Sequence, residues 1–433
     1  MADILPLISA ALDRSYHGVR LGVAVSGGGD SVALLLVIKA WSQRRGVRVH
    51  VATVDHGLRP ESAAEAEGVA SLAKRLGISC DILRWGQWDG VGNLQAEARA
   101  ARRRLLTRWA ARRGVSAIAL GHTMDDQAET VLMRLGRGAG VDGLSAMNMR
   151  TAADGVVWLR PMLGVRRAAL RDWLVANGES WVDDPSNDDL KYERVKARRA
   201  LGVLADLGIS AEGLSATAER MQSARTALDD AAATLASEAA KWGACGELRL
   251  SLKPLRAAPR ELTRRLLRAG LTRAAGAEYG PRADAEAKLL SAIMSLRLGG
   301  GRSLHGCLVR PEGVDRIVIA REAAAVCCEE ISTPRVGDLW DGRFRIDDAE
   351  TGPGAVIAPL GEAGARRLNE LAASGAWSAP ESWREAPRAA RLTTPALWRE
   401  NLLAAAPLAA YGEGLRATFV GAFPGWAEPP QAA

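Results

Sequence analysis

The chain has 433 residues, of which 48% are hydrophobic and 25% charged, so it can bury a large core and should contain two or three domains. Its five cysteines, an odd number without a Cys-x-x-Cys pair, argue against a disulfide framework and indicate a reducing, cytoplasmic compartment. The first residues lack a basic segment followed by an apolar one, and no apolar run approaches the length of a membrane span. The net charge of +7 favours a polyanionic partner. Only seven of the 57 basic residues are lysines, and this excess of arginine fits the base composition of the genome as well as it fits phosphate binding.

Short β-branched runs alternate with helical stretches between residue 18 and about residue 175. The pattern predicts strands over 23–25, 47–54, 80–84 and 116–120, and helices over 30–44, 62–76, 94–113 and 126–135. Such alternation builds a parallel sheet with helices on both faces. Ligands of these folds bind outside the carboxyl ends of the strands, so the loops after Val25, Val54 and Leu120 are expected to converge.

The character of the sequence changes beyond about residue 205. Leu214, Met221, Leu228 and Leu235 recur every seven residues and predict a long helix that packs along one seam. Strands of a hairpin are predicted over 308–310 and 316–319, and a linker over 327–334. We therefore predict an α/β domain over 1–205, a helical or mixed domain over 206–328 and a small α+β domain over 334–433 with a disordered tail.

A glycine-rich turn between the first predicted strand and its helix is the first chemical signal. It consists of Ser26, Gly27, Gly28, Gly29, Asp30 and Ser31. Three glycines let the backbone approach a ligand closely, and the amides at the helix start then converge on an anion. The P-loop pattern is excluded because the nearest lysine is Lys39, and the dinucleotide fingerprint because Val32 stands where it needs glycine. The alternative is a tight turn in which Asp30 only caps the helix. The turn resembles the pyrophosphate loop of enzymes that split ATP into AMP and pyrophosphate.

A second polar cluster follows the strand predicted over 116–120. His122 comes directly after this strand, and Asp125, Asp126 and Glu129 begin the next helix, where Asp126 and Glu129 share a face. Acidic residues in a first turn can simply complement the helix dipole. Opposite a pyrophosphate loop they suit a magnesium and amine site better, because Mg²⁺ takes oxygen ligands and carboxylates hold a cationic substrate.

These motifs closely resemble those of the tRNA(Ile)-lysidine synthetase family across about residues 18 to 200. The segments that carry the resemblance are Ser26–Ser31, Asp55–Arg59, Asn93–Arg99, Gly121–Thr130, Arg137–Gly138, Gly143–Leu144, Arg160–Pro161 and Trp181–Asn187. The later part is similar to the accessory domains of the family more weakly, chiefly through Leu304–Cys307 and through Arg321–Glu322 after the last predicted strand. The sequence departs from the family pattern at Arg103, at Thr123, where a second histidine is often found, and at Val195, where asparagine is usual.

The resemblance implies a Rossmann-like fold of the adenine nucleotide alpha hydrolase type in a catalytic domain over 1–205, followed by tRNA-binding and accessory domains. It implies that ATP adenylates the wobble cytidine in the CAU anticodon of an isoleucine tRNA, releasing pyrophosphate. Free L-lysine then displaces AMP to form lysidine. The substrates and cofactors implied are therefore ATP, Mg²⁺, L-lysine and this tRNA.

The resemblance also implies roles for individual residues. Residues Ser26 to Ser31 would bind ATP. The catalytic residues would be Asp30, His122, Asp126 and Glu129, with Asp30 and Asp126 as ligands of Mg²⁺. Arg99, Arg194 and Arg198 would contact tRNA or substrate. In the later domains we expect phosphate contacts from a basic cluster, namely Arg256, Arg260, Arg264, Arg265 and Arg268.

Three other functions compete with this one. An amidotransferase of the same superfamily would need a glutaminase nucleophile or a partner that supplies ammonia, and the sequence shows no such domain. A related pyrophosphate-loop enzyme that delivers sulfur to tRNA would need paired cysteines near the site, whereas Cys80 is the only cysteine before residue 245. A non-catalytic RNA-binding protein would have no need of Asp30, Asp126 and Glu129. The sequence leaves the oligomeric state undecided, with a homodimer among the options.

Overall fold

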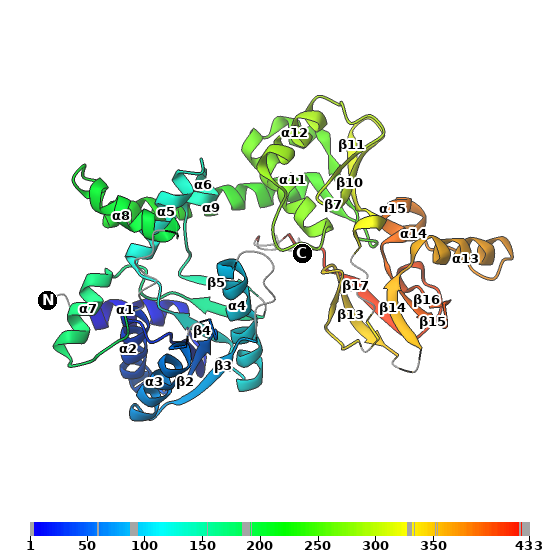
Figure 1. The fold of residues 1–433 in the computed structure, drawn as a ribbon. Coiled ribbons are helices and arrows are strands. Elements are labelled where there is room, and N and C mark those ends of the chain that lie inside the picture. Colours follow the sequence, from blue (N-terminus) through cyan, green and yellow to red (C-terminus); the bar gives the residue numbers. More distant parts are fainter. Residues whose placement is uncertain are drawn as a thin grey trace. The chain divides into compact units, whose positions relative to one another are not determined.

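The fold was obtained as a computed structural model (Figure 1). It describes residues 4–58, 60–86, 94–153, 155–183, 191, 193–326, 331–332, 334–350, 352, 354–423 and 426, without the side chains of residues 95 and 96. The chain divides into two compact units, Met1–Arg225 and Thr226–Ala433. No described helix combines the length and the apolar character that a bilayer crossing requires.

A six-stranded sheet in the order β3-β2-β1-β4-β6-β5 lies at the centre of the first unit. Its strands are β1 (Arg20–Ala24), β2 (Arg48–Asp55), β3 (Ser79–Arg84), β4 (Ala117–Leu120), β5 (Arg150–Ala153) and β6 (Val156–Leu159). All neighbouring strands run parallel except β5, which is antiparallel to β6 at the edge. The predicted parallel sheet is therefore confirmed, with an edge hairpin that we did not predict.

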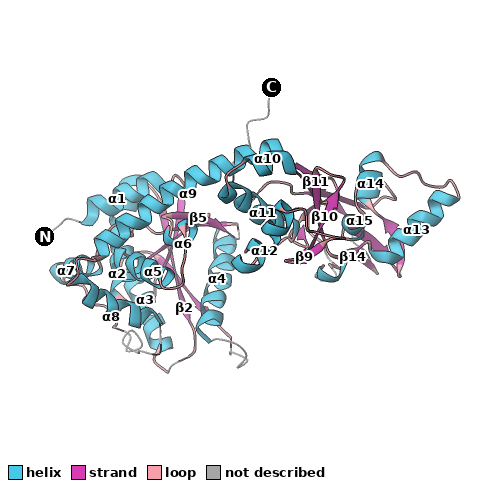
Figure 2. Ribbon diagram, turned by 90° about the horizontal axis from the view of Figure 1, so that it is seen from above, coloured by secondary structure: helices cyan, strands magenta, loops and turns pink. Residues whose placement is uncertain are grey.

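Helices cover both faces of this sheet, as predicted (Figure 2). The helices of the first unit are α1 (Ile4–Ser15), α2 (Gly29–Arg45), α3 (Ser62–Arg75), α4 (Leu94–Arg113), α5 (Met124–Leu135), α6 (Val141–Leu144), α7 (Arg167–Ala176) and α8 (Glu193–Ala205). One buried core joins α1, α2, α3 and α7 to Leu21 and Val23 of β1. A second core joins α4 to Ala24 of the same strand, because successive side chains of a strand point to opposite faces.

The second unit contains three small sheets, in the orders β7-β8-β11-β10-β9, β12-β13-β17 and β14-β15-β16. Their strands are β7 (Ala240–Trp242), β8 (Leu248–Ser251), β9 (Arg302–Leu304), β10 (Cys307–Glu312), β11 (Arg316–Arg321), β12 (Leu339–Trp340), β13 (Phe344–Ala349), β14 (Ala355–Pro359), β15 (Pro395–Arg399), β16 (Leu402–Ala405) and β17 (Leu415–Phe419). Its shorter helices are α10 (Leu252–Ala257), α11 (Arg260–Ala274), α12 (Ala283–Met294), α13 (Gly361–Ala373), α14 (Glu381–Glu385) and α15 (Arg388–Leu392).

Two predictions for the later part of the chain are confirmed. The long helix is α9 (Ala211–Ala239), and β10 and β11 pair as an antiparallel hairpin. Most of the predicted linker over 327–334 and the end of the predicted disordered tail lie outside the described residues, as do the family-motif residues Arg59, Asn93 and 184–187. The division into three domains stays a prediction.

Gly22 in β1 determines how closely α4 approaches the sheet. A Cβ atom at this position would lie 2.8 Å from Cζ3 of Trp109. Trp109 is only 1% exposed, and its indole Nε1 donates a hydrogen bond to Oδ2 of Asp81 at 2.8 Å. The ring therefore has neither space to move into nor freedom to turn without losing that bond.

We predict that Gly22→Ala destabilises the first unit by about 1–3 kcal/mol, because it overpacks the core against the buried ring of Trp109. Gly68→Ala is the matched control: nothing lies within 4 Å of its Cβ on α3, and alanine there should stabilise the helix by up to about 1 kcal/mol. Amide hydrogen exchange of the peptide that covers β1, followed by mass spectrometry, measures both effects. Equal protection in the two variants would contradict the steric argument.

Candidate active site

The glycine-rich turn is held in shape by its own hydrogen bonds. Gly27 has a φ of +88°, a conformation that favours glycine. Oγ of Ser31 accepts a hydrogen bond from the backbone N of Ser26 at 3.1 Å and donates one to the carbonyl oxygen of Gly28 at 2.8 Å. Helix α2 starts at Gly29, and the first amides of a helix have no acceptor within it. The turn therefore has the form of an anion-binding helix start, as the sequence predicts.

The loop after β4 lies directly against this turn. A Cβ on Gly121 would lie 3.2 Å from both N and Cα of Ser31, so only glycine lets the two backbones approach so closely. Two of the three loops that we expected to converge therefore touch. The polar residues that follow Gly121 are thereby placed beside the start of α2.

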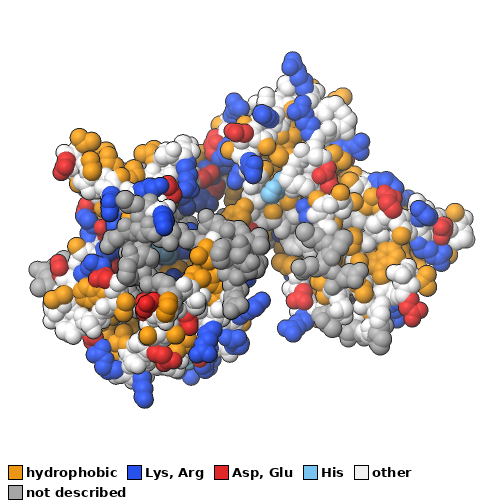
Figure 3. All heavy atoms as spheres, in the orientation of Figure 1, with side chains coloured by type: hydrophobic (Ala, Val, Ile, Leu, Met, Phe, Trp, Pro, Cys, Tyr) orange, Lys and Arg blue, Asp and Glu red, His pale blue; other side chains and the backbone are white. Residues whose placement is uncertain are grey.

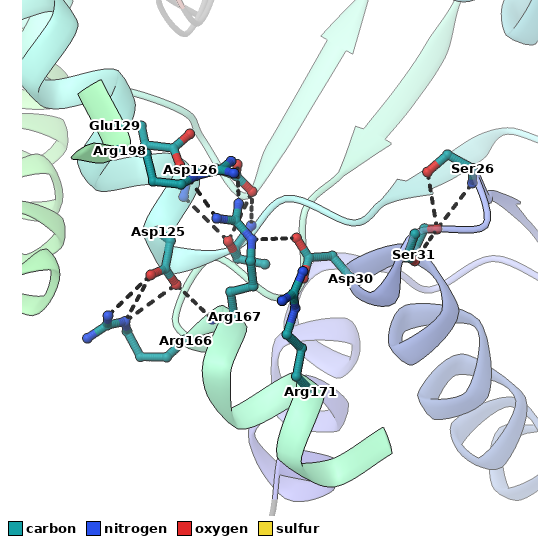
Figure 4. Close-up of polar contacts among 12 residues, drawn as sticks. Ser26, Asp30, Ser31, Asp125, Asp126, Glu129, Arg166, Arg167, Arg171 and Arg198 are labelled. Atoms are coloured by element: carbon teal, nitrogen blue, oxygen red, sulfur yellow. Dashed lines mark hydrogen bonds and ion pairs between the residues drawn. The ribbon is translucent and has the colours of Figure 1, made fainter. Parts of the chain in front are cut away.

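Arg167, at the start of α7, bridges three carboxylates from different segments (Figure 4). Its Nε lies 2.9 Å from Oδ2 of Asp30, and its Nη2 lies 2.9 Å from Oδ1 of Asp126. Its Nη1 lies 3.5 Å from Oε1 of Glu129. One guanidinium thus joins the pyrophosphate-type loop to the acidic start of α5.

Two further arginines complete the cluster from α8. Arg194 donates from Nε to Oε2 of Glu129 at 2.8 Å and from Nη2 to Oδ1 of Asp126 at 3.1 Å. Arg198 donates from Nε to Oε1 of Glu129 at 2.9 Å. Glu129 has no exposed surface, so its charge depends on these partners. We call Asp30, Asp126, Glu129, Arg167, Arg194 and Arg198 the charged cluster; its formal charges balance.

Thr123, the residue where the family often has a second histidine, fixes the orientation of Asp126. It is the N-cap of α5, and it forms a capping box in which its backbone N and its Oγ1 donate to Oδ2 of Asp126 at 2.7 and 3.0 Å. Oδ1 of Asp126 is left to face the arginines. Both oxygens of this carboxylate therefore accept hydrogen bonds.

Asp125 has a different task from its neighbour Asp126. Its Oδ2 accepts a hydrogen bond from the backbone N of Arg167 at 2.7 Å, and its Oδ1 pairs with the side chain of Arg166 at 3.2 Å. A carboxylate at the first amide of a helix satisfies a donor that has no partner inside it. Asp125 therefore anchors α7 and so positions the guanidinium of Arg167.

Burial and ion pairing act on the two aspartates with different results. Burial opposes ionisation of Asp126, but Arg194 and Arg167 outweigh it and hold its pKa below the usual range. Burial raises the pKa of Asp30 in spite of Arg167. Oδ1 of Asp30 is also buried without a hydrogen-bond partner. Asp30 is therefore the member of the charged cluster with an oxygen still available to a ligand.

His122 lies between β4 and α5 with its Nδ1 buried and unpartnered. Burial lowers the pKa of His122 to about 4, and the positive charges of Arg160, Arg194 and Arg102 act in the same direction. The imidazole is therefore neutral near pH 7. Burial also lowers the pKa of His56, which comes from the loop after β2, and the positive charge of Arg102 acts in the same direction on both histidines.

The structure places Arg99 apart from the other candidate residues. It is exposed on α4, and none of the described contacts joins it to the charged cluster. Arg167 is the important residue that sequence reasoning missed. Its only signal was its position six residues after Pro161 of a family motif.

We predict that His122 makes folding stability depend on pH. Its pKa is about 4 when folded and about 6.5 when unfolded, so the unfolded chain binds more protons and stability falls as pH drops from about 6.5 towards 4. At pH 5 this cost is about 2 kcal/mol. His122→Asn should remove it, so urea unfolding at pH 7.5 and pH 5 should show a smaller loss than in the wild type. An identical loss in both proteins would contradict the prediction.

Comparison with known proteins agrees with the motifs. Residues 7–204 match the family model of the PP-loop domain. The chain is 46% identical over 397 residues to tRNA(Ile)-lysidine synthase of Ruegeria pomeroyi, covering 91% of this chain and 90% of that protein. It is 33% identical over 350 residues to the protein of the same name from Wolbachia pipientis wMel, covering 80% and 81%.

Among solved structures, U34-tRNA thiolase NcsA from Methanococcus maripaludis is similar with a TM-score of 0.43 and 16% identity, over 50% of this chain and 76% of that one. This likeness bears on neither substrate nor mechanism. The identities to the two synthases, over most of both chains, do identify the family. The chain belongs to the tRNA(Ile)-lysidine synthase family, a family of tRNA-modifying ligases with a PP-loop ATP-binding domain.

Proposed function

We propose that this protein acts in the cytoplasm and ligates free L-lysine to the wobble cytidine of an isoleucine tRNA with a CAU anticodon, at the expense of ATP. The cytosine O2 attacks the α-phosphate of ATP, and pyrophosphate leaves. The side-chain amine of lysine then attacks C2 of the adenylated base, AMP leaves with O2, and the amine loses a proton. The observation that carries the proposal is the charged cluster beside the glycine-rich turn, in a chain of this family.

The first step needs a group that holds pyrophosphate and a means of offsetting its charge. The start of α2 provides backbone donors, and Ser26 and Ser31 lie in the same turn. Mg²⁺ bound to ATP takes most of its ligands from phosphates and water, so one or two carboxylates suffice. Asp30 fits this task because its buried Oδ1 lacks a partner. Bound there, Mg²⁺ would neutralise charge on the transferred phosphates.

Asp126 can serve as the second carboxylate ligand of Mg²⁺ only after its present hydrogen bonds and ion pairs have changed. Its Oδ2 is taken by Thr123 and its Oδ1 by Arg167 and Arg194. Among the described residues, no group of three or more acidic, histidine or cysteine side chains forms a metal site. We therefore assign Mg²⁺ first to Asp30, and keep Asp126 as a ligand that requires Arg167 to move.

The second step needs a site for a cationic amino acid. Glu129 and Asp126 bind guanidinium groups, and this supports the proposal that their oxygens hold the cationic end of a substrate. A lysine ammonium that replaced one guanidinium would keep the charge of the cluster balanced. Its free pKa is about 10.4, so the amine must lose a proton before it attacks.

The tRNA-binding role of the chain after residue 205 is also part of the proposal. Lys and Arg side chains are spread over the visible surface of both units (Figure 3). The predicted basic cluster is less available than we expected, because Arg264 and Arg268 pair with Glu286 and Arg265 pairs with Asp229. Arg256 and Arg260, the other two members of the predicted cluster, are exposed, so we expect its phosphate contacts from these two.

Sulfur transfer is disfavoured by the chemistry of the nearest thiol. Cys80 is half-buried in β3, and burial raises its pKa to about 11. Since the thiolate is the reactive form, this cysteine is inert near pH 7. Cys80→Ser should therefore leave tRNA modification unchanged.

The test of the function is incubation of the protein with ATP, Mg²⁺, labelled lysine and total tRNA, followed by nucleoside analysis. We expect label in a modified cytidine and release of AMP and pyrophosphate in equal amounts. Label that requires sulfur donors instead of lysine, or tRNA binding without any product, would contradict the proposal.

Asp30→Ala should abolish pyrophosphate exchange while the chain stays folded, because the turn keeps its amides but loses the free carboxylate oxygen. Exchange between ATP and labelled pyrophosphate, in the presence of tRNA and without lysine, measures the effect. Asp172→Ala, an exposed carboxylate on α7, is the control. Unchanged exchange in a folded Asp30→Ala variant would refute the assignment.

Glu129→Gln should impair modification far more than tRNA binding. Loss of a buried charge that pairs with Arg194 and Arg198 costs on the order of 2–5 kcal/mol, or at least about 30-fold in rate. A steady-state rate paired with a filter-binding constant separates the two effects, with Glu219→Gln at an exposed position of α9 as control. Equal losses of rate and affinity would indicate a structural role for Glu129.

A further inference from the structure

A cavity of about 610 Å³ lies within the second unit, remote in sequence from every motif of the ATP site. Its volume is in the range of small-molecule sites. Polar groups of His305, Arg321 and Asp341 line part of it, and Ile331, Leu339 and Trp340 line another part. The cavity therefore offers both a charged end and an apolar wall.

The charged end carries more positive than negative charge. Arg321 and Arg343 share one carboxylate: Nη2 of Arg321 lies 3.1 Å from Oδ1 of Asp341, and Nε of Arg343 lies 2.7 Å from Oδ2. Arg321 is 8% exposed and Arg343 is 0% exposed. Burial lowers the pKa of Arg343 to about 10, a sign that its charge is poorly compensated. Among the described lining residues, Asp341 supplies the negative charge.

A buried ring nitrogen at this end has no hydrogen-bond partner: it is Nε2 of His305. His305 has a φ of +58°, a costly conformation for a residue other than glycine, in the turn between β9 and β10. Nη1 of Arg321 lies beside Gly306 of the same turn, where a Cβ atom would be 2.5 Å away. A ligand with acceptor oxygens can accept a hydrogen bond from the Nε2–H tautomer of His305 and contact the guanidinium of Arg321.

The apolar wall favours a nucleotide over a bare ion. A phosphate on Arg321 and His305 would occupy only the charged end, and the remaining lining includes the apolar side chains of Ile331 and Leu339, the latter 53% exposed. A base can cover such an apolar surface, and a buried guanidinium is suited to phosphate oxygens.

We propose that this cavity binds one unpaired nucleotide of the tRNA, with its phosphate on Arg321 and His305. This inference rests on the proposed function for the identity of the RNA. The site would bind the tRNA through residues that are remote in the protein sequence from the ATP-site motifs. It would also replace the phosphate contacts that Arg264, Arg265 and Arg268 cannot make while they are ion-paired.

Arg321→Gln tests the proposal in the full-length chain. This variant leaves Arg343 and Asp341 as a charge-balanced pair, so the fold should persist, and thermal melting checks it. Arg316→Gln, on the same strand but exposed, is the matched control. We expect Arg321→Gln to weaken binding of an unmodified tRNA transcript five- to tenfold at constant salt and to reduce the salt slope by about one, while the control changes binding less than twofold.

Phosphate ethylation interference locates the contact. In the wild type, ethylation of at least one phosphate in an unpaired part of the tRNA should block binding, and in Arg321→Gln that interference should disappear. If Arg321→Gln does not fold, His305→Gly, which keeps the positive φ and removes the ring, should lose the same interference. Unchanged interference in the folded variants would overturn the proposal.

Two further measurements distinguish the other outcomes. If inorganic phosphate stabilises the wild type but not Arg321→Gln, while their tRNA interference patterns agree, the cavity takes a free anion and the RNA assignment is wrong. Lysidine formation by the wild type is measured in parallel. If the wild type forms lysidine but interference is insensitive to Arg321, the cavity inference alone fails; if it forms none, the proposed function fails.

Discussion

Three carboxylates packed together in a largely buried site repel one another and lose the solvation that stabilises their charge. Asp30, Asp126 and Glu129 can occupy such a site only because guanidinium groups neutralise them. Arg167 is the central partner, since it touches all three. The arrangement depends on Asp125, which holds the start of α7, and on Thr123, which turns one oxygen of Asp126 away from the arginines.

Each partner in this cluster comes from a different part of the first unit. Asp30 follows β1, Asp126 and Glu129 begin the helix after β4, Arg167 begins α7, and α8 contributes the remaining arginines. The site therefore exists only when the sheet and both later helices have folded. Because the charges already balance, an arriving cation must displace a guanidinium or bring its own anion. In the proposed reaction ATP with Mg²⁺ would do the latter, whereas lysine would require one of the arginine side chains to move.

Local patterns in the sequence were enough to predict the parallel strands, four of the covering helices and the residues at the strand ends. The glycines around Asp30 and the spacing of Asp126 and Glu129 are short-range signals, and the family resemblance supported them. Arg167 could not be found in this way, because its contact with Asp30 spans 137 residues and the chain is rich in arginine. Helices α1, α6, α7 and α8 and the β5–β6 hairpin also escaped prediction.

The backbones of Gly276 and Gly342 meet at the edge of the cavity in the second unit. A Cβ on Gly276 would lie 2.0 Å from the carbonyl oxygen of Asp341, and one on Gly342 would lie 2.4 Å from the oxygen of Gly276. Both residues also have positive φ angles, so a side chain is disfavoured by the backbone conformation as well as by the steric clash. In a mutational scan every substitution of these two glycines would reduce function. That loss would resemble the loss of a ligand contact, although its cause is backbone packing. Only substitutions of polar lining groups such as Arg321 can separate the two causes.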